Sequence, residues 1–297
     1  MSNIFGALRK GGASTPELEQ DLISEARDPR LRAARPVFVA QRPLPGTALP
    51  NSTREAAGET IKQVSLRISA LAPVLPFDQR NQRAAEQYQI VRTKILHHPR
   101  KPQFVLISSA TSGDGKTVTS INIAASLALK TDALVLLIDG DLRRPSVART
   151  LGISPEPGLN DVLAGKMPLE KAIVRAAELP NLHILPAGEC STRAADLLDS
   201  DRWRSLVATV RTRFTSVICD APPIATVADY ELLQLAAEAV ILVARPGHSE
   251  RQACFKALAG VDSKKMLGVV LNCVEDWWLW KTPSYGYYGK RIPQDDR

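Results

Sequence analysis

Residues 104–130 read FVLISSATSGDGKTVTSINIAASLALK. The apolar run Phe104–Ile107 is long enough for a buried strand, and the small and polar residues that follow it, up to Gly115, predict a loop. Beyond that loop, apolar residues recur at helical spacing between Ile121 and Ala128. A strand, a glycine-containing loop and a helix in this order are the context that a phosphate-binding loop requires.

The loop has the chemistry of a phosphate site. Successive backbone N–H groups, with the positive end of a helix behind them, surround a phosphate, and glycine lets the backbone come close. A lysine then reaches the β- and γ-phosphates of a nucleoside triphosphate, and a hydroxyl ligates Mg²⁺. The alternative is a chance Gly-Lys-Thr match on a surface loop, which the flanking strand and helix disfavour. Nucleotide contacts are predicted for Ser112, Gly113, Asp114, Gly115, Lys116, Thr117 and Val118.

The size and composition are those of an ordinary soluble protein. The chain has 297 residues, enough for one α/β domain and an extension, with 44% hydrophobic and 23% charged residues. Its net charge of +7 and isoelectric point near 9.3 permit contact with acidic surfaces such as phospholipid headgroups or nucleic acid. The basic residues are dispersed, however, so we favour a mildly basic, solvated surface and expect no nucleic-acid partner.

The cysteines and the N-terminal residues indicate the cellular compartment of the protein. The four cysteines show no Cys-x-x-Cys spacing, which indicates a reducing cytoplasm and no metal site; Cys219 and Cys273 lie in apolar runs and are expected in the core. The first residues, MSNIFGALRKGG, lack the apolar stretch of a signal peptide, and no apolar run approaches the roughly 18 residues of a membrane span. We therefore expect a cytoplasmic protein, which a partner would have to bring to the membrane if it works there.

Three parts are distinguished along the chain. Residues 1–79 are punctuated by prolines and indicate an N-terminal extension that is largely linker or disordered. Within it, 16–26 could form a short helix, and 61–71 alternates between apolar and polar residues, which indicates either an isolated strand or no element. Residues 80–274 form the expected domain, and 275–297 form a flexible tail rich in tryptophan and tyrosine.

The domain alternates between helical and buried-strand patterns. A helix is expected at 80–98, ending before Pro99, and apolar runs after the first strand predict strands at 134–138, 182–185, 216–219, 239–243 and 267–271. Helical patterns are found at 158–165, 193–198, 203–213, 227–237 and 249–261. This alternation predicts an α/β fold with a doubly wound, mostly parallel sheet flanked by helices, as in P-loop NTPases.

Polar side chains follow several predicted strands. Asp139 and Asp141 come after the second strand, Asp220 after the fourth and Asn272 after the last. Open parallel sheets bind ligands at the carboxyl ends of their strands, so we expect these groups to meet Lys116 at one edge, with Asp220 near Mg²⁺. One Asp there could instead cap a helix, although two of them at i and i+2 make capping alone the less favoured explanation.

The C-terminal segment gathers aromatic residues. Three of the four tryptophans and three of the five tyrosines lie between Trp277 and Tyr288. Proline and glycine around the tyrosines disfavour a regular element. The tail therefore either packs on a groove or presents flexible phospho-acceptors, Tyr285, Tyr287 and Tyr288.

Together, these motifs resemble those of the cytoplasmic bacterial tyrosine kinases of capsule and exopolysaccharide assembly, the CpsD/CapB type. The resemblance covers roughly residues 80–290. It rests on Ala110–Thr117 as Walker A, on LIDGDLR at 137–143 as Walker A′ and on VICDAPP at 217–223 as Walker B. GLNDVLAG at 158–165, LPAG at 185–188 and the tyrosine cluster look like further family features.

The resemblance implies an ATP- and Mg²⁺-dependent protein-tyrosine autokinase that phosphorylates its own tyrosine cluster and regulates polysaccharide polymerisation and export. It implies a membrane copolymerase that activates the kinase, a cognate phosphatase and a possible homo-oligomer. Arg143 would add charge near the phosphates, and Asn272 would contact adenine. Lys116, Asp139 and Asp141 would be catalytic, with one of the two carboxylates accepting the tyrosine proton; the magnesium ligands would be Thr117, Asp139 and Asp220.

The family pattern is not complete, and two alternatives remain. The family's Glu-x2-Arg-x2-Arg helix motif, which serves ring-like assembly, appears here as Glu86, Gln89 and Arg92. A partitioning or positioning ATPase of the ParA/MinD kind would share the sheet and the Asp motifs, but usually carries a second lysine early in Walker A, where this chain has Thr111, flanked by Ala110 and Ser112. A non-catalytic adaptor is the other alternative, which the complete set of lysine, hydroxyl and carboxylates disfavours.

Overall fold

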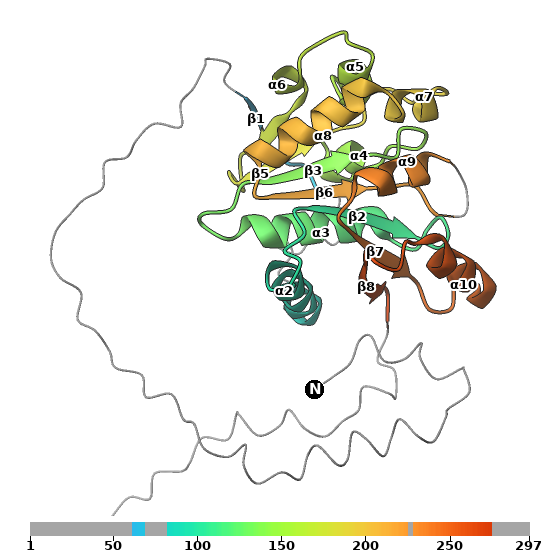
Figure 1. Ribbon diagram of the computed structural model, residues 1–297. Helices are drawn as coiled ribbons and strands as arrows, with labels where there is room; N and C mark the ends of the chain where they lie inside the picture. The colour runs from blue at the N-terminus through green and yellow to red at the C-terminus, as the bar shows by residue number, and fades with distance from the viewer. Residues whose placement is uncertain (1–60, 69–81, 225–227, 275–297) are drawn as a thin grey trace, which may run out of the picture. The chain divides into compact units, whose positions relative to one another are not determined.

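The computed structural model describes residues 61–68, 82–224 and 228–274, and eight strands of this part form a single sheet (Figure 1). The strands are β1 (Lys62–Val64), β2 (Phe104–Ser109), β3 (Val135–Asp139), β4 (Val174–Ala176), β5 (Leu182–Leu185), β6 (Ser216–Asp220), β7 (Ala239–Ala244) and β8 (Met266–Leu271). The helices are α2 (Gln82–Leu96), α3 (Lys116–Ala128), α4 (Val147–Leu151), α5 (Leu159–Leu163), α6 (Leu169–Ala172), α7 (Ala194–Leu198), α8 (Asp201–Arg213), α9 (Asp229–Ala236) and α10 (Arg251–Gly260).

The order of the strands across the sheet is β1-β4-β5-β3-β6-β2-β7-β8. All neighbours from β5 to β8 pair in parallel, whereas β4 runs antiparallel to β5 and β1 runs parallel to β4. In the centre, Asp139 of β3 lies opposite Asp220 of β6, and Ile107 of β2 also pairs with Asp220. The carboxyl ends of these three strands therefore meet at one point of the sheet edge.

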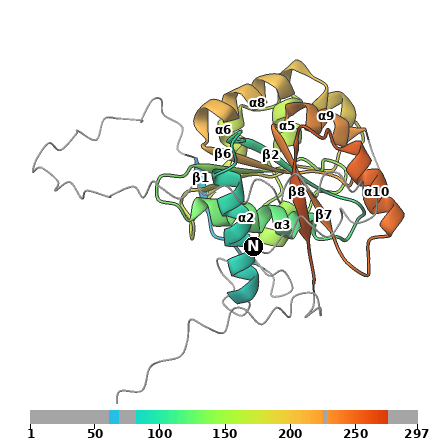
Figure 2. The ribbon, with the colours of Figure 1, turned by 60° about the horizontal axis from the view of Figure 1, so that its bottom comes forward.

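Helices cover both faces of the sheet, as Figures 1 and 2 show. On one face, α2, α3 and α4 pack against strand residues such as Val105 and Ile107. On the other, α5 to α10 pack against Phe104 and Leu106 of the same strand. Every residue of β2 is buried because both faces are covered, which explains why its sequence is continuously apolar at its start rather than alternating.

The structure confirms the predicted fold class and every strand expected between residues 104 and 271. It adds β4, α4 and α6, whose three to five residues are too short to show a period in the sequence. The possible helix at 16–26 and the aromatic tail lie outside the described residues. The stretch at 61–71 was open between an isolated strand and no element; residues 62–64 are a strand, and it is not isolated, because it pairs with β4 and so extends the sheet before residue 80.

Residues after β1 are fastened to the domain by backbone hydrogen bonds. The N–H of Leu66 donates to both carboxylate oxygens of Glu178 at 3.1 Å, and the N–H of Arg67 donates to the carbonyl of Leu151 at 2.9 Å. Leu151 is the last residue of α4, and Gly152 follows it with φ +65°. Leu66 therefore lies against the segment after β4, and Arg67 lies against the end of α4.

Replacing Gly152 tests this contact. A Cβ at this position would lie 2.2 Å from the carbonyl oxygen of Arg67, in addition to the strain of a positive φ. Gly247 has φ +76° with nothing within 4 Å of such a Cβ, so Gly247→Ala measures the backbone strain alone, about 1–2 kcal/mol. We expect Gly152→Ala to lower the free energy of unfolding in urea by about 1–3 kcal/mol more than Gly247→Ala. Equal losses would show that Arg67 does not lie on α4.

Candidate active site

Two glycines in the left-handed region shape the loop after β2. Gly113 has φ +90° and Gly115 has φ +89°, conformations that residues with a Cβ rarely adopt. A Cβ on Gly115 would also lie 1.9 Å from Nδ2 of Asn272. The 13-residue helix α3 begins directly after Gly115, so the positive end of its dipole lies at the loop. This is the geometry that binds phosphate.

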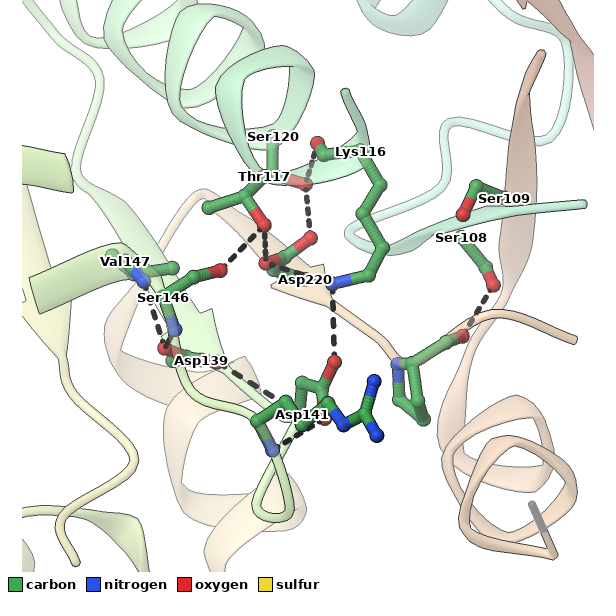
Figure 3. A network of polar contacts seen from close by, with 12 residues as sticks. Ser108, Ser109, Lys116, Thr117, Ser120, Asp139, Asp141, Ser146, Val147 and Asp220 are labelled. Atoms are coloured by element: carbon green, nitrogen blue, oxygen red, sulfur yellow. Dashed lines mark hydrogen bonds and ion pairs between the residues drawn. The ribbon is translucent and has the colours of Figure 1, made fainter. Parts of the chain in front are cut away.

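The ammonium of Lys116 lies between two carboxylates (Figure 3). Its Nζ donates to Oδ2 of Asp141 at 3.1 Å and is 3.7 Å from Oδ2 of Asp220. Burial disfavours the charged ammonium, but the carboxylates of Asp220 and Asp141 outweigh burial and raise the pKa of Lys116 above its ordinary value. Lys116 therefore stays protonated at neutral pH and can balance negative charge at this edge.

Two hydroxyls near the start of α3 hold Asp220 (Figure 3). Oγ1 of Thr117 donates to Oδ2 of Asp220 at 2.6 Å, and Oγ of Ser120 donates to Oδ1 at 3.0 Å. Because the Thr117 proton goes to Asp220, the 2.8 Å contact between Thr117 and Oγ of Ser146 has Ser146 as its donor. Burial raises the pKa of Asp220, and Lys116 and the two hydroxyls oppose that rise.

Asp139 and Asp141 have different surroundings although only one residue separates them. Oδ2 of Asp139 accepts the backbone N–H groups of Ser146 and Val147 at 3.0 and 2.9 Å, at the start of α4. Burial, reinforced by the charge of Asp220, raises the pKa of Asp139 to about 7 although these N–H groups favour its charged form. Asp141 instead turns one oxygen to Lys116 and the other to the N–H of Arg144 at 3.0 Å. Neither Asp is the N-cap residue of α4, which is Ser146; Asp139 accepts the N–H groups at the start of this helix from the end of β3.

A family model described as an AAA domain matches residues 103–254. Tyrosine-protein kinase YwqD of Bacillus subtilis is 35% identical over 211 residues, which are 70% of this chain and 87% of YwqD. Tyrosine-protein kinase CpsD of Streptococcus pneumoniae is 33% identical over 211 residues, 70% of this chain and 91% of that protein. The chain belongs to this family of bacterial tyrosine-protein kinases.

Solved structures agree with the family. The kinase domain of Escherichia coli tyrosine kinase ETK has a TM-score of 0.61 and 29% identity, covering 77% of this chain and 88% of that domain. The VpsO kinase domain has a TM-score of 0.57 and 30% identity, covering 66% of this chain and 98% of that domain. These findings confirm the predicted family and tyrosine-kinase activity and favour them over a ParA/MinD-type ATPase. Nucleotide binding is a property of this P-loop family.

Two residues of the kinase make contacts that the sequence did not predict. Arg143 forms a bidentate ion pair with Asp229, the first residue of α9, with Nε–Oδ2 2.6 Å and Nη2–Oδ1 3.1 Å. Nδ2 of Asn272 donates to the backbone carbonyl of Asp114 at 2.9 Å. The side chain of Asn272 therefore holds the backbone of the phosphate-binding loop at Asp114. Contacts of Arg143 with phosphate and of Asn272 with adenine stay predictions.

Asp114 was predicted to contact nucleotide, whereas four other residues of the site, Ser120, Asp229, His248 and Ser249, were missed in the sequence. The side chain of Asp114 is fully buried and bonds within the protein, to Thr111 and to Ser249, so only its backbone is available to a phosphate. Ser249 and His248 follow β7, and the rule that polar residues after strands share one sheet edge could have found them. Ser120 lies one helical turn after Lys116, on the same side of α3. Asp229 carried no signal in the sequence.

The oxygen donors at this edge fit Mg²⁺. Thr117 and Asp220 offer a hydroxyl and a carboxylate, the ligand types that Mg²⁺ prefers. Within residues 61–68, 82–224 and 228–274, no group of three His, Cys, Asp or Glu side chains could hold a metal ion. A site with one hydroxyl and one carboxylate suits Mg²⁺, which usually keeps several waters and binds substrate phosphates.

Two cysteines were predicted to lie in the core of the protein. Cys219 lies in the core as predicted, but Cys273 is exposed, because it follows β8 at the sheet edge, where the chain leaves the last strand. Its N–H bonds to Oδ1 of Asn272 at 2.9 Å.

In the described part of the chain, every helix is too short or too polar to cross a membrane.

The raised pKa of Asp139 predicts a pH dependence. Because the pKa rises from about 3.8 to about 7 on folding, the stabilising effect of protonation is complete below about pH 4 and is lost as the pH rises through 7. Asp139→Asn removes this titration and keeps one oxygen for Ser146 and Val147. In the absence of nucleotide, the free energy of unfolding should therefore fall less between pH 4 and 8 in Asp139→Asn than in the wild type.

Urea denaturation at several pH values measures this difference. Asp201→Asn, at a side chain that is 94% exposed, controls for the loss of one negative charge. If the Asp139→Asn and wild-type proteins lose the same stability over this range, the buried carboxylate is not the titrating group.

Proposed function

We propose that the kinase transfers the γ-phosphoryl group of ATP to its own tyrosines Tyr285, Tyr287 and Tyr288, and that this controls the polymerisation and export of capsule or exopolysaccharide. The observation that carries the proposal is the placement of the Lys116 ammonium 3.1 Å from Asp141 and 3.7 Å from Asp220. Family membership supports phosphoryl transfer to tyrosine at this lysine. The loop and Lys116 would hold the phosphates, as their geometry suits.

The contacts favour Asp141 as the proton acceptor. Both oxygens of Asp139 face backbone N–H groups, of Ser146 and Val147 on one side and of Asp141 on the other, at 3.3 Å for the last. Asp141 has one oxygen on a flexible ammonium, which can move to a phosphate. Tyrosine oxygen would form the new P–O bond as its proton passes to Asp141, and the bridging oxygen would leave with ADP. A tyrosine pKa near 10 requires such a base during the transfer.

Mg²⁺ would be held by Thr117 and Asp220, with Asp139 next to them. When bound, it would neutralise charge on the β- and γ-phosphates. The hydrogen bond of 2.6 Å between Thr117 and Asp220 supports the assignment, because it brings the two oxygens within reach of one ion.

The partners are proposed from the same family. A membrane copolymerase would recruit the kinase to the inner face of the cell membrane and activate it, and a phosphatase would reset the tyrosines. Tyrosine kinase EpsB of Ralstonia solanacearum matches over 63% of this chain, but over 25% of its own length, so a related kinase region occurs within a much longer protein. Glu86 and Gln89 are exposed on α2, where a homo-oligomer could form.

Labelling of the tail tests the proposed activity. The full chain is incubated with ATP and Mg²⁺, alone and with a candidate activator, and phosphate is located by mass spectrometry. Lys116→Met should lower labelling by about 100-fold or more, since it removes the charge that holds the phosphates. Lys130→Met, at an exposed lysine that pairs with Asp132 at 3.0 Å, is the matched control and should keep wild-type labelling. ATP hydrolysis without label on the three tyrosines would sink the kinase proposal.

The two carboxylates can be separated by substitution. Asp141→Asn should lower the rate of tail phosphorylation by about 10²- to 10⁴-fold while ADP affinity changes little, because it removes the proposed base. Replacing Tyr285, Tyr287 and Tyr288 together by Phe should remove most label and leave ADP affinity unchanged. A rate that survives in Asp141→Asn and collapses in Asp139→Asn would assign the base to Asp139.

A further inference from the structure

The connection between β7 and α10 contacts the phosphate-binding loop through a buried carboxylate. Asp114 is fully buried, and its Oδ1 accepts Oγ of Ser249 at 2.6 Å. Thr111 donates its N–H to Oδ2 at 2.8 Å and its hydroxyl to Oδ1 at 3.0 Å. Oγ of Ser249 also accepts the N–H of Arg245 at 2.9 Å, which leaves its own proton for Asp114. The carboxylate thus ties the start of the loop to the segment before α10.

His248 makes a second contact with the same loop. Its Nε2 lies 3.0 Å from the carbonyl oxygen of Ser112. Because a carbonyl only accepts, Nε2 carries the proton in this hydrogen bond. A Cβ on Gly113 would lie 2.9 Å from Nε2, so the ring lies directly against the backbone of Gly113. Ser112 and Gly113 are therefore held in place from outside the loop.

The fold explains why these two segments meet. β7 pairs in parallel with β2, so the loops that follow them leave the sheet at the same edge. The N–H groups of His248 and Ser249 both donate to the carbonyl of Arg245, at 3.1 and 2.9 Å, which forms a compact turn before α10. The hydrogen bonds within this turn, including that from the N–H of Arg245 to Oγ of Ser249, hold Ser249 in position beside Asp114.

We propose that Ser249 and His248 are positioning residues for nucleotide binding, acting through Asp114 and Ser112. They hold the loop in the conformation that its N–H groups need to surround a phosphate. The inference rests on the proposed binding of nucleotide at this loop and is independent of the phosphate acceptor. Without Ser249, a buried carboxylate loses a donor, and the loop is expected to shift until Asp114 finds another.

A binding measurement on the full chain tests the role of Ser249. A fluorescent ADP analogue reports affinity without any phosphoryl transfer, and thermal unfolding without nucleotide reports folding. Ser249→Ala should weaken ADP binding about tenfold, as for the loss of one hydrogen bond to a carboxylate, and lower the melting temperature by only a few degrees. Ser249→Thr keeps the hydroxyl and should restore most of the affinity. Thr209→Ala, which removes an exposed hydroxyl of α8 bonded to the carbonyl of Ser205, is the matched control.

His248 gives a second, separate test. His248→Ala should weaken ADP binding about fivefold, and His248→Gln, which keeps an N–H donor, should weaken it less. The double variant with Ser249→Ala should lose less than the product of the single losses, since both residues hold one loop. Single variants that bind ADP within twofold of the wild type would overturn the proposal, as would a lower melting temperature with unchanged affinity. If Lys116→Met leaves ADP affinity unchanged, the nucleotide site itself is misassigned.

Discussion

The central constraint on this molecule is the negative charge gathered at the carboxyl edge of its sheet. Parallel pairing of β3 and β6 sets Asp139 opposite Asp220, and both side chains are fully buried. Two buried carboxylates side by side are unfavourable unless cations, hydroxyls or N–H groups surround them. The first five residues of α3 supply a cation and two hydroxyls, and the start of α4 supplies N–H groups. The positions of α3 and α4 therefore determine whether these two buried carboxylates are stabilised.

The buried carboxylates of the site differ in their hydrogen-bond partners. Both carboxylates are buried, but Asp139 is turned inward to α4, while Asp141 faces Lys116. Asp114 is as deeply buried as Asp139, but only hydroxyls and an N–H lie within hydrogen-bond distance of it. Hydrogen bonds to neutral donors hold a carboxylate in place without neutralising it. A carboxylate held in this way, such as that of Asp114, is suited to supporting the loop. A carboxylate beside a flexible ammonium, such as that of Asp141, is suited to accepting a proton.

Much of the fold follows from short-range patterns. The strand at Phe104–Ser109 and its parallel neighbours are buried on both faces, so their apolar runs stand out in the sequence. β1 and β4 have three residues each and are only partly buried, so no comparable run marks them. Their place in the sheet depends on pairing between residues 62–64 and 174–176, far apart along the chain. Long-range pairing of this kind leaves little trace in local composition.

By itself, the sequence determined the loop, its lysine and the carboxylates that face it, because glycine, charge and strand ends follow local rules. It also determined that these groups share one edge, since parallel strands end together. Only the tertiary structure decided which partner each side chain takes: Arg143 bonds Asp229, Asn272 bonds the loop backbone, and Asp139 rather than Asp141 accepts the N–H groups at the start of α4. These choices depend on distances of a few ångströms between separate elements, which packing of the two helical layers sets.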